Sequence, residues 1–347
     1  MEARSVWFSA ERTVEIRTET VGSPGPSEIL CEALASGISH GTEMTIFRGQ
    51  APDVRTELDL PQDHIQPQAT MGGSFEQRFP IKYAYANVGR VLEAGAESGL
   101  SPGDLVFTRV PHQTHYVVDV ALATLLPPDL ALVDAATTLG LLDVAVNALL
   151  DHPVLFGDVV AVYGLGLVGL FTVQLARRTA STVIAVDPLA HRRDLALKYG
   201  ADVAVAPELA VSTVKERSAG RGADVSIEAS GAPAALQTAI ESTGAEGTVL
   251  VPAYYGRKPV GLVMSPEFHM RSLRMVSSSV NAPDGRLSAR WTNARRLELD
   301  VALLDELHAG ELVSHRIPFD DAAAAFELVD QHPEEVLSVV LTYGTGT

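Results

Sequence analysis

One stretch of the chain, Val159–Asp187, constrains the fold more than any other. It reads VVAVYGLGLVGLFTVQLARRTASTVIAVD, in which an apolar run ends directly in a glycine-rich turn, Gly164–Gly169. A helix-compatible segment follows to about Ala180, and a second apolar run, Thr182–Val186, ends in an acid. Strand, glycine turn, helix, strand and terminal acid follow one another as in a βαβ unit that binds a dinucleotide.

The residues of the turn have separate tasks in such a unit. Gly164 allows a sharp turn, Gly166 lets the backbone approach a pyrophosphate, and Gly169 lets the helix lie close to the strand. The helix then begins at Leu167 and Val168, whose N–H groups and helix dipole favour the negative charge of the phosphates. The alternative is a tight turn in a sheet that binds no ligand.

Asp187 bears on the choice of cofactor. Its carboxylate is placed to accept hydrogen bonds from a ribose diol, and it would repel the 2′-phosphate of NADP. NAD is therefore the expected cofactor. Arg192 and Arg193 lie close by in the sequence and could offset that repulsion, so Arg192 is counted among the cofactor-binding candidates and NADP stays open.

Charge and hydropathy exclude several classes of partner. The formal net charge is −17, which argues against binding to a phosphate backbone. The first residues, MEARSVWFSAERTVEI, contain no apolar core of a signal peptide, and no stretch approaches 18 uninterrupted apolar residues. We therefore expect a cytoplasmic protein that acts on a small molecule and binds neither nucleic acid nor membrane.

The single cysteine, Cys31, limits the metal and redox chemistry. One thiol allows no intrachain disulfide and no cluster of thiolates for a structural zinc ion. Its neighbours, Ile29 and Leu30, predict a buried position on a strand.

The first part of the chain has the pattern of a β domain. Short alternating segments are separated by Gly, Pro and Asp turns, which is typical of a mostly antiparallel, barrel-like domain. These segments are Thr13–Arg17, Glu28–Ala33, Asn87–Leu92, Asp104–Thr108 and His115–Val118. The long polar stretch Gln50–Pro80 is either disordered or a lid over a site.

From Asp134 the pattern changes to alternating helices and strands. A helix over Ala135–Leu150 leads into the glycine turn, and six strands in parallel order predict a doubly wound sheet. The strands are Val159–Tyr163, Thr182–Val186, Asp202–Ala206, Asp224–Glu228, Thr248–Val251 and Arg274–Ser278. The C-terminal part adds helices at Asn293–Leu307 and Asp320–Gln331 and a last strand at Val336–Tyr343.

The whole chain resembles the medium-chain dehydrogenase/reductase superfamily. The local matches are the glycine turn and the segments Gly103–Val106, Lys198–Asp202, Glu228–Gly231 and Glu246–Val249. The resemblance implies a GroES-like catalytic domain formed by 1–139 and 276–347 and a Rossmann domain formed by 140–275. It also implies an α/β fold, an active site in the cleft between the domains, and a homodimer made by pairing the sixth strands.

Two family motifs for zinc are altered. The segment Gly37–Glu43 lacks the cysteine of the family pattern Gly-Ile-Cys-x-Thr-Asp, and Ala84-Tyr85-Ala86 stands where Gly-His-Glu is usual. The chain therefore resembles a zinc-lacking branch, and we expect no bound metal. The alternative is a rebuilt zinc site that uses His40, His64 and His115.

Without zinc, a hydrogen-bonding side chain must stabilise the substrate oxygen. Ser39, His40 and Thr42 lie in the altered motif, where a hydroxyl or an imidazole could reach the substrate. Ser39 and Thr42 could equally cap the following turn or helix, and His40 could be a surface residue. Tyr85 occupies the position of the zinc-binding histidine, although a core tyrosine would look the same.

Asp143 interrupts the apolar stretch Leu139–Leu150, where an unpaired buried carboxylate would be costly. It therefore needs a partner or a position in the cleft, where it could act as a base or bind substrate hydroxyls; a solvent-facing helix acid is the alternative. A surface position is the default for four further residues: His112, His115, His269 and Arg271.

These features favour a zinc-independent, NAD-dependent oxidoreductase that interconverts a secondary alcohol and a ketone. A polyol, sugar or cyclitol would suit a cleft rich in hydroxyl groups and carboxylates. The alternatives are a zinc-free quinone or enoyl reductase that uses NADPH, and a nucleotide-binding protein without catalytic activity.

Overall fold

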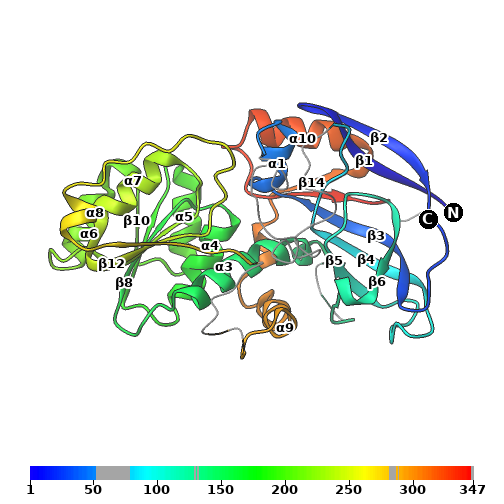
Figure 1. The fold of residues 1–347 in the computed structure, drawn as a ribbon, viewed down its shortest axis with the longest axis horizontal. Helices are drawn as coiled ribbons and strands as arrows, with labels where there is room; N and C mark the ends of the chain where they lie inside the picture. The colour runs from blue at the N-terminus through cyan, green and yellow to red at the C-terminus, as the bar shows by residue number, and fades with distance from the viewer. Residues whose placement is uncertain (52–78, 129, 131–132, 281–286, 288, 345–347) are drawn as a thin grey trace. The chain divides into compact units, whose positions relative to one another are not determined.

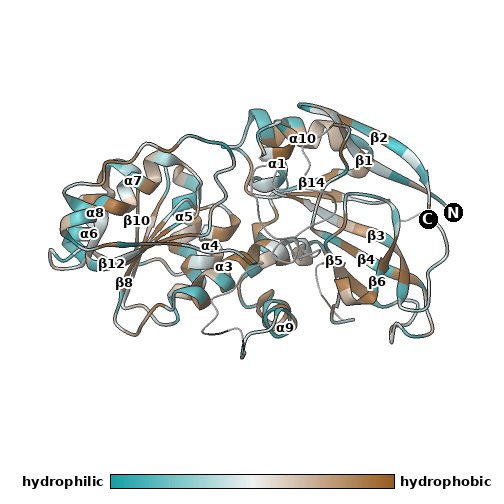
Figure 2. Ribbon diagram, in the orientation of Figure 1, coloured by the Kyte–Doolittle hydropathy of each residue, from teal (hydrophilic) through white to brown (hydrophobic). Residues whose placement is uncertain are grey.

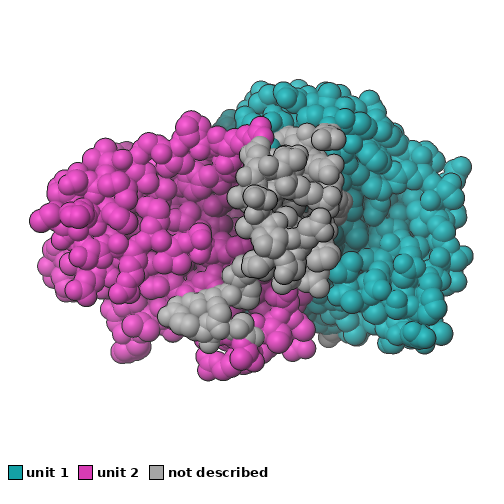
Figure 3. Space-filling view, viewed as in Figure 1, with its two compact units in different colours: residues 1–140, 301–347 teal, residues 141–300 magenta. Residues whose placement is uncertain are grey.

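The computed structural model describes residues 1–51, 79–128, 130, 133–280, 287 and 289–344. The chain forms two compact units, which Figure 3 shows in different colours. Unit 1 comprises Met1–Gly140 and Val301–Thr347, and unit 2 comprises Leu141–Asp300. The predicted lid Gln50–Pro80, apart from its two ends, and the candidate ligand His64 lie outside the described residues.

Unit 1 is built around the long strand β3 (Glu28–Ile38), which pairs antiparallel with β4, β6 and β15. The sheet runs in the order β14-β15-β3-β4-β5-β7, with β6 added on β3 (Figure 1). Its other strands are β4 (Asn87–Ala94), β5 (Leu105–Thr108), β6 (His115–Asp119), β7 (Ala123–Leu125), β14 (His315–Pro318) and β15 (Val339–Thr342). The predicted mostly antiparallel β domain is confirmed.

Most residues of β3 are buried, as expected for a strand at the centre of a sheet, and its side chains point alternately to the two faces. Ile29, Cys31 and Ala33 point to one face and pack against Val91 and Tyr116 from neighbouring strands. Cys31 has no exposed surface, as expected for a buried strand residue, and burial raises the pKa of its thiol to about 12. The thiol is therefore neutral at physiological pH and inert as a nucleophile.

The described part of unit 1 also contains a second, two-stranded sheet and two α-helices. The sheet pairs β1 (Glu2–Ala10) with β2 (Thr13–Thr20), and the helices are α1 (Thr42–Phe47) and α10 (Ala322–Gln331). Phe8, Phe47 and Phe326 join these elements, because each ring centroid lies 5.0–5.4 Å from the other two. The C-terminal return is thus part of the same core as the N-terminus.

Unit 2 contains a six-stranded parallel sheet in the order β10-β9-β8-β11-β12-β13 (Figure 1). The strands are β8 (Val159–Tyr163), β9 (Thr182–Val186), β10 (Val203–Val205), β11 (Ala223–Glu228), β12 (Thr243–Val251) and β13 (Arg274–Ser277). Strand order reverses beside β8, which is the switch point where doubly wound sheets bind ligands at the carboxyl ends of their strands. The predicted Rossmann sheet is confirmed.

The helices of unit 2 differ in how deeply they are buried. They are α3 (Leu139–Asp151), α4 (Leu167–Ala176), α5 (Ala190–Lys198), α6 (Ala210–Arg217), α7 (Pro233–Ser242), α8 (Glu267–Met270) and α9 (Asn293–Leu303). Helix α4 is almost wholly buried, whereas polar residues predominate on α6 and α8 (Figure 2). The helix that follows the glycine turn is therefore held firmly against the sheet.

The division into units differs from the expected boundaries at one end. Unit 2 ends at Asp300, whereas the sequence prediction returned to the first domain at 276. The boundary falls within α9, and the part of this helix that lies in unit 2 includes Arg296, which pairs with Asp143 of α3.

One helical stretch, Val133–Asp151, is long and apolar enough to cross a membrane by composition alone. Most of it is buried inside the fold, as in the core helix of a globular domain.

Candidate active site

The glycine turn of unit 2 has the geometry that a dinucleotide phosphate requires. Gly164 has φ +86°, and a Cβ there would lie 2.5 Å from the Cβ of Ser230. A Cβ on Gly169 would lie 1.8 Å from the carbonyl oxygen of Gly164, so only glycine allows α4 to pack this closely. At Gly166, by contrast, no atom lies within 4 Å of the added Cβ. The open side of the turn is therefore at Gly166, where a pyrophosphate would sit.

The first turn of α4 supplies the donors for that anion. Gly166 is the N-cap residue, and no side chain caps the helix. The N–H groups of Leu167 and Val168 belong to the first turn, whose donors have no intrahelical acceptors. Unit 2 thus presents both candidate residues as backbone donors beside the open side of the turn.

Asp187 closes the site at the end of β9. Its side chain is buried, and its two carboxylate oxygens accept the N–H groups of Leu165 and Leu189, each at 2.8 Å. A carboxylate has about four acceptor positions, so capacity remains for a ribose diol. Asp187 therefore fixes the turn and keeps acceptor capacity at the end of β9.

The two arginines near Asp187 behave differently. Arg193 donates to the carbonyl oxygens of Asp187 and Pro188, each at 2.8 Å, and so belongs to the backbone of the turn. Arg192 is partly buried on α5; burial lowers its pKa, and the charge of Asp187 opposes that shift. Arg192 therefore lies within the electrostatic reach of the acid that we expect to bind ribose.

In unit 1, the structure brings two of the predicted catalytic residues together. The phenol of Tyr85 donates a short hydrogen bond to Oγ of Ser39, and both side chains are buried. Ser39 directly follows β3, and Tyr85 precedes β4. Of the candidates in the segment Gly37–Glu43, it is Ser39 that forms a hydrogen bond with Tyr85.

The hydrogen bonds around Ser39 leave its own hydrogen for another acceptor. Oγ accepts from Tyr85 and, at 3.3 Å, from the N–H of Gly41. A hydroxyl has two acceptor positions and one hydrogen. Within the described part of the chain, no acceptor is recorded for that hydrogen, so it can be donated to the oxygen of a substrate.

Burial keeps this pair of hydroxyls protonated. It raises the pKa of Tyr85 well above the usual 10; the hydrogen bond to Ser39 opposes the shift, the charge of Glu43 adds to it, and Arg109 opposes it. Tyr85 is therefore a neutral phenol at physiological pH. It acts as a hydrogen-bond donor toward Ser39 and not as a phenolate base.

The other candidates of this loop do not join the pair. Thr42 is the first residue of α1, and its side chain makes no recorded contact with Ser39 or Tyr85. His40 is half-buried in the turn before α1. Ser39 accepts the N–H of Gly41 in the turn before α1, but no side chain makes a cap hydrogen bond to this helix.

Asp143 has the partner that its burial requires, and this partner lies within unit 2. Both of its oxygens accept hydrogen bonds from Arg296, which also donates to Asn147 at 3.1 Å and to the carbonyl of Val280 at 3.0 Å. Asp143 and Arg296 are both buried. The ion pair attaches α9 to α3. This structural role accounts for the buried carboxylate of Asp143 without a catalytic function.

A buried histidine was missed by the sequence reading. His112 has no exposed surface, so the expected surface position is wrong for it. Its Nε2 lies 2.8 Å from Oε1 of Glu43, another fully buried residue, and its Nδ1 lies 2.6 Å from Oγ of Ser36. Glu43 lies within the altered zinc motif but had not been singled out. The sequence feature that points to Glu43 is its position in that motif, four residues after Ser39.

The other three residues predicted to lie at the surface are exposed or partly buried. His269 is exposed, and His115 is half-buried at the start of β6. Arg271 is partly buried and donates to the carbonyl oxygens of Glu241 and Thr243, at 2.9 and 2.8 Å.

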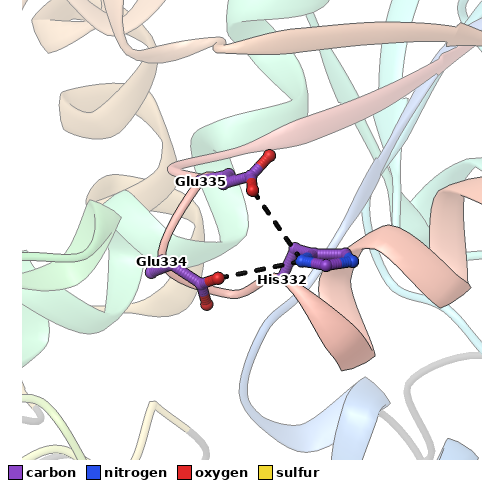
Figure 4. Close-up of side chains that lie close together, drawn as sticks. All are labelled: His332, Glu334 and Glu335. Carbon is purple, nitrogen blue, oxygen red and sulfur yellow. Dashed lines mark ion pairs between the residues drawn. The ribbon is translucent and has the colours of Figure 1, made fainter.

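The described residues do not fit the catalytic zinc site of the resembled family. Zinc needs about three ligands from Cys, His or acidic side chains, and Ser39 and Tyr85 instead bond to each other. In the described ranges, the one group of three suitable ligand atoms is His332, Glu334 and Glu335 (Figure 4). All three side chains are exposed at the end of α10, and the histidine pairs with both acids at 3.8 Å.

Comparison with known proteins identifies similar chains. Residues 168–297 match the model of a family described as zinc-binding dehydrogenase. This range lies in unit 2 and excludes Ser39 and Tyr85, which belong to unit 1.

Two curated relatives and one solved structure cover different shares of the chain. D-guloside 3-dehydrogenase of Escherichia coli (strain K12) is 28% identical over 88% of this chain and 89% of its own. Sorbitol dehydrogenase of Rattus norvegicus is 31% identical over 58% of this chain and 54% of its own. A protein of Sinorhizobium meliloti 1021, crystallised with NADP, is 20% identical and covers 99% of both chains with a TM-score of 0.75.

Proposed function

Since the chain belongs to the medium-chain dehydrogenase/reductase superfamily and is an oxidoreductase of that type, we propose that it interconverts a secondary alcohol and a ketone of a sugar or polyol, with NAD as cofactor and without zinc. The observation that carries this proposal is the hydroxyl pair of Ser39 and Tyr85. It stands where the superfamily usually places zinc ligands, and it offers a donated hydrogen in place of a metal ion.

The cofactor is assigned to unit 2. The open side of the turn at Gly166 and the first N–H groups of α4 would hold the pyrophosphate, and Asp187 would accept from the ribose diol. The nicotinamide, when bound, supplies or takes the hydride. Support for NAD over NADP comes from the charge of Asp187, although the S. meliloti neighbour contains NADP and Arg192 lies close.

The substrate oxygen is assigned to unit 1. During reduction, negative charge develops on the carbonyl oxygen as the hydride arrives, and Ser39 stabilises it by donating its free hydrogen. Tyr85 supports that donation because it holds Oγ of Ser39 as an acceptor and stays protonated. In oxidation the same hydroxyl donates to a lone pair of the substrate alcohol and so orients it, while the proton of that alcohol leaves to solvent.

The substrate class rests on two relatives. One is named for oxidation of a guloside at position 3, and the other for sorbitol. Both names describe polyhydroxylated compounds, which carry secondary hydroxyl groups. A site based on donated and accepted hydrogen bonds suits such substrates, because it discriminates well between a molecule that has a hydroxyl and one that lacks it.

Cofactor binding gives the most direct test of this function. We expect NADH to bind to the purified protein with a change in its fluorescence and to displace NADPH, because Asp187 repels the 2′-phosphate of NADPH. The measurement is a titration with each cofactor, followed by NADH-dependent reduction of ketoses such as D-xylulose and D-fructose. Tight binding of NADPH alone, with reduction of a quinone, would favour the quinone reductase instead. Binding of neither cofactor would favour a protein without catalytic activity.

A further inference from the structure

A second polar cluster lies in unit 1, and three of its four members are completely buried. Its members are Ser36 on β3, Glu43 on α1, His112 between β5 and β6, and Tyr343 after β15. Ser36, Glu43 and His112 have no exposed surface, although each carries a polar side chain. Buried polar groups are costly unless they are hydrogen-bonded, so the connections of this cluster need to be complete.

The contacts run in one continuous line. The hydroxyl of Tyr343 lies 2.7 Å from Oγ of Ser36, which lies 2.6 Å from Nδ1 of His112. On the other side of the ring, Nε2 lies 2.8 Å from Oε1 of Glu43. Oε2 of Glu43 then accepts the backbone N–H of Ser39 at 2.8 Å. The line therefore ends on the residue that donates to the substrate in the proposed function.

The partners determine where the hydrogens are. A carboxylate only accepts, so Nε2 of His112 is the donor toward Glu43. In the neutral ring Nδ1 is then an acceptor, which takes the hydrogen of Ser36, and Ser36 accepts that of Tyr343. Burial raises the pKa of Tyr343, which keeps its phenol protonated. Every donor in the line has an acceptor, so the carboxylate of Glu43 is held in one orientation.

We propose that Glu43, oriented by His112, is a positioning residue that holds Ser39 in place through the backbone N–H of Ser39 and places a negative charge beside the hydroxyl pair. This role presupposes the proposed function of Ser39 and Tyr85 and adds to it. No side-chain hydrogen bond is recorded between Glu43 and the hydroxyl pair, so Glu43 acts through the backbone of Ser39 and through its charge. It takes no proton in the reaction.

The charged groups around the two phenols fix the sign of this effect. Tyr85 experiences the negative charge of Glu43, which favours the neutral phenol, and the positive charge of Arg109, which favours the phenolate. Tyr343 also experiences the charge of Glu43. If the charge of Glu43 is removed, it no longer offsets the positive charge of Arg109 at Tyr85, so the pKa of the phenol falls.

The two ring nitrogens of His112 provide a matched pair of variants. Glutamine can place its amide nitrogen where Nε2 lies, so His112→Gln keeps the donor to Glu43. Asparagine can mimic Nδ1 but does not reach Glu43, so His112→Asn removes the side-chain donor that orients the buried carboxylate. We expect His112→Gln to behave like the unchanged protein, and His112→Asn to lower turnover as Glu43→Gln does.

The readout is the ionisation of Tyr85, measured as the tyrosinate absorbance of each protein minus that of its Tyr85→Phe counterpart. We expect Glu43→Gln to move this titration to lower pH by about one unit. With a ketose and NADH, Glu43→Gln and His112→Asn should both lower kcat by about tenfold while the NADH dissociation constant stays within twofold. This titration needs no turnover, so it separates failure of the positioning role from failure of the proposed function.

Asp330 serves as the control for loss of a buried acid in the same unit. Its nearly buried carboxylate pairs with Arg12 at 3.0 Å and Arg48 at 2.5 Å, and it makes no recorded contact with the cluster. Asp330→Asn should lower the unfolding temperature but leave the titration of Tyr85 unchanged. The inference is overturned if Glu43→Gln titrates like the unchanged protein, if Asp330→Asn shifts the titration equally, or if His112→Gln and His112→Asn behave alike.

Discussion

Replacement of Ser39 by alanine is expected to lower kcat for ketose reduction by about 10²–10³-fold, because it removes the one hydrogen bond donated to the developing oxyanion. The donor is already oriented in the protein, since Tyr85 and Gly41 occupy both acceptor positions of Oγ. The cofactor is assigned to unit 2, so the NADH dissociation constant should change by less than about twofold. Steady-state kinetics and a fluorescence titration on the same preparation measure both quantities.

Two further variants test whether the effect of Ser39→Ala is specific to the hydroxyl pair. Tyr85→Phe should cost less than Ser39→Ala, because Ser39 keeps its hydrogen although it is no longer held by the phenol. Thr45→Val is the control: it removes a hydroxyl from the same segment, where Thr45 donates to the carbonyl of Gly41 at 2.9 Å. It should retain nearly full activity. Normal turnover of Ser39→Ala would remove the hydroxyl pair from the mechanism.

The glycine turn gives the second large effect, and two of its residues should respond in opposite ways. Gly169→Ala places a Cβ 1.8 Å from the carbonyl oxygen of Gly164, so α4 has to move off the strand. We expect a loss of about 3 kcal/mol or more, seen as a fall of about 6–12 °C in Tm or as failure to fold. Gly166→Ala meets no protein atom within 4 Å, and its φ of −74° suits alanine.

Gly166→Ala should therefore keep nearly the same Tm but bind NADH at least tenfold more weakly, because its methyl group occupies the space assigned to the pyrophosphate. Thermal unfolding and cofactor titration distinguish the two variants. If Gly166→Ala binds NADH as tightly as the unchanged protein does, the pyrophosphate does not lie on this side of the turn.

Most of the nucleotide-binding fold could be predicted because its signals are local. The predicted strands Val159–Tyr163 and Thr182–Val186 coincide with β8 and β9. Each is an apolar or amphipathic segment bounded by Gly, Pro or Asp. Strand β1 was missed even though its buried and exposed residues largely alternate, because it contains Arg4, Ser5 and Ser9 among the apolar residues.

The candidate active site was harder to predict because its contacts join distant residues. Ser39 and Tyr85 were chosen individually, but nothing in the sequence indicated that they share a hydrogen bond across 46 residues. His112 and Glu43 are 69 residues apart, and Tyr343 and Ser36 are 307 apart. Asp143 was rightly expected to need a partner, yet Arg296 lies 153 residues away and could not be identified.

The central claim is that hydroxyl groups, and not a metal ion, stabilise the substrate oxygen. The most direct measurement is the NADH-dependent ketose reductase activity of the protein after exhaustive treatment with a chelator, with the zinc content of the same sample determined by mass spectrometry. We predict full activity at far less than one zinc per chain. Activity that disappears with the metal and returns when one equivalent of zinc is added would contradict the claim.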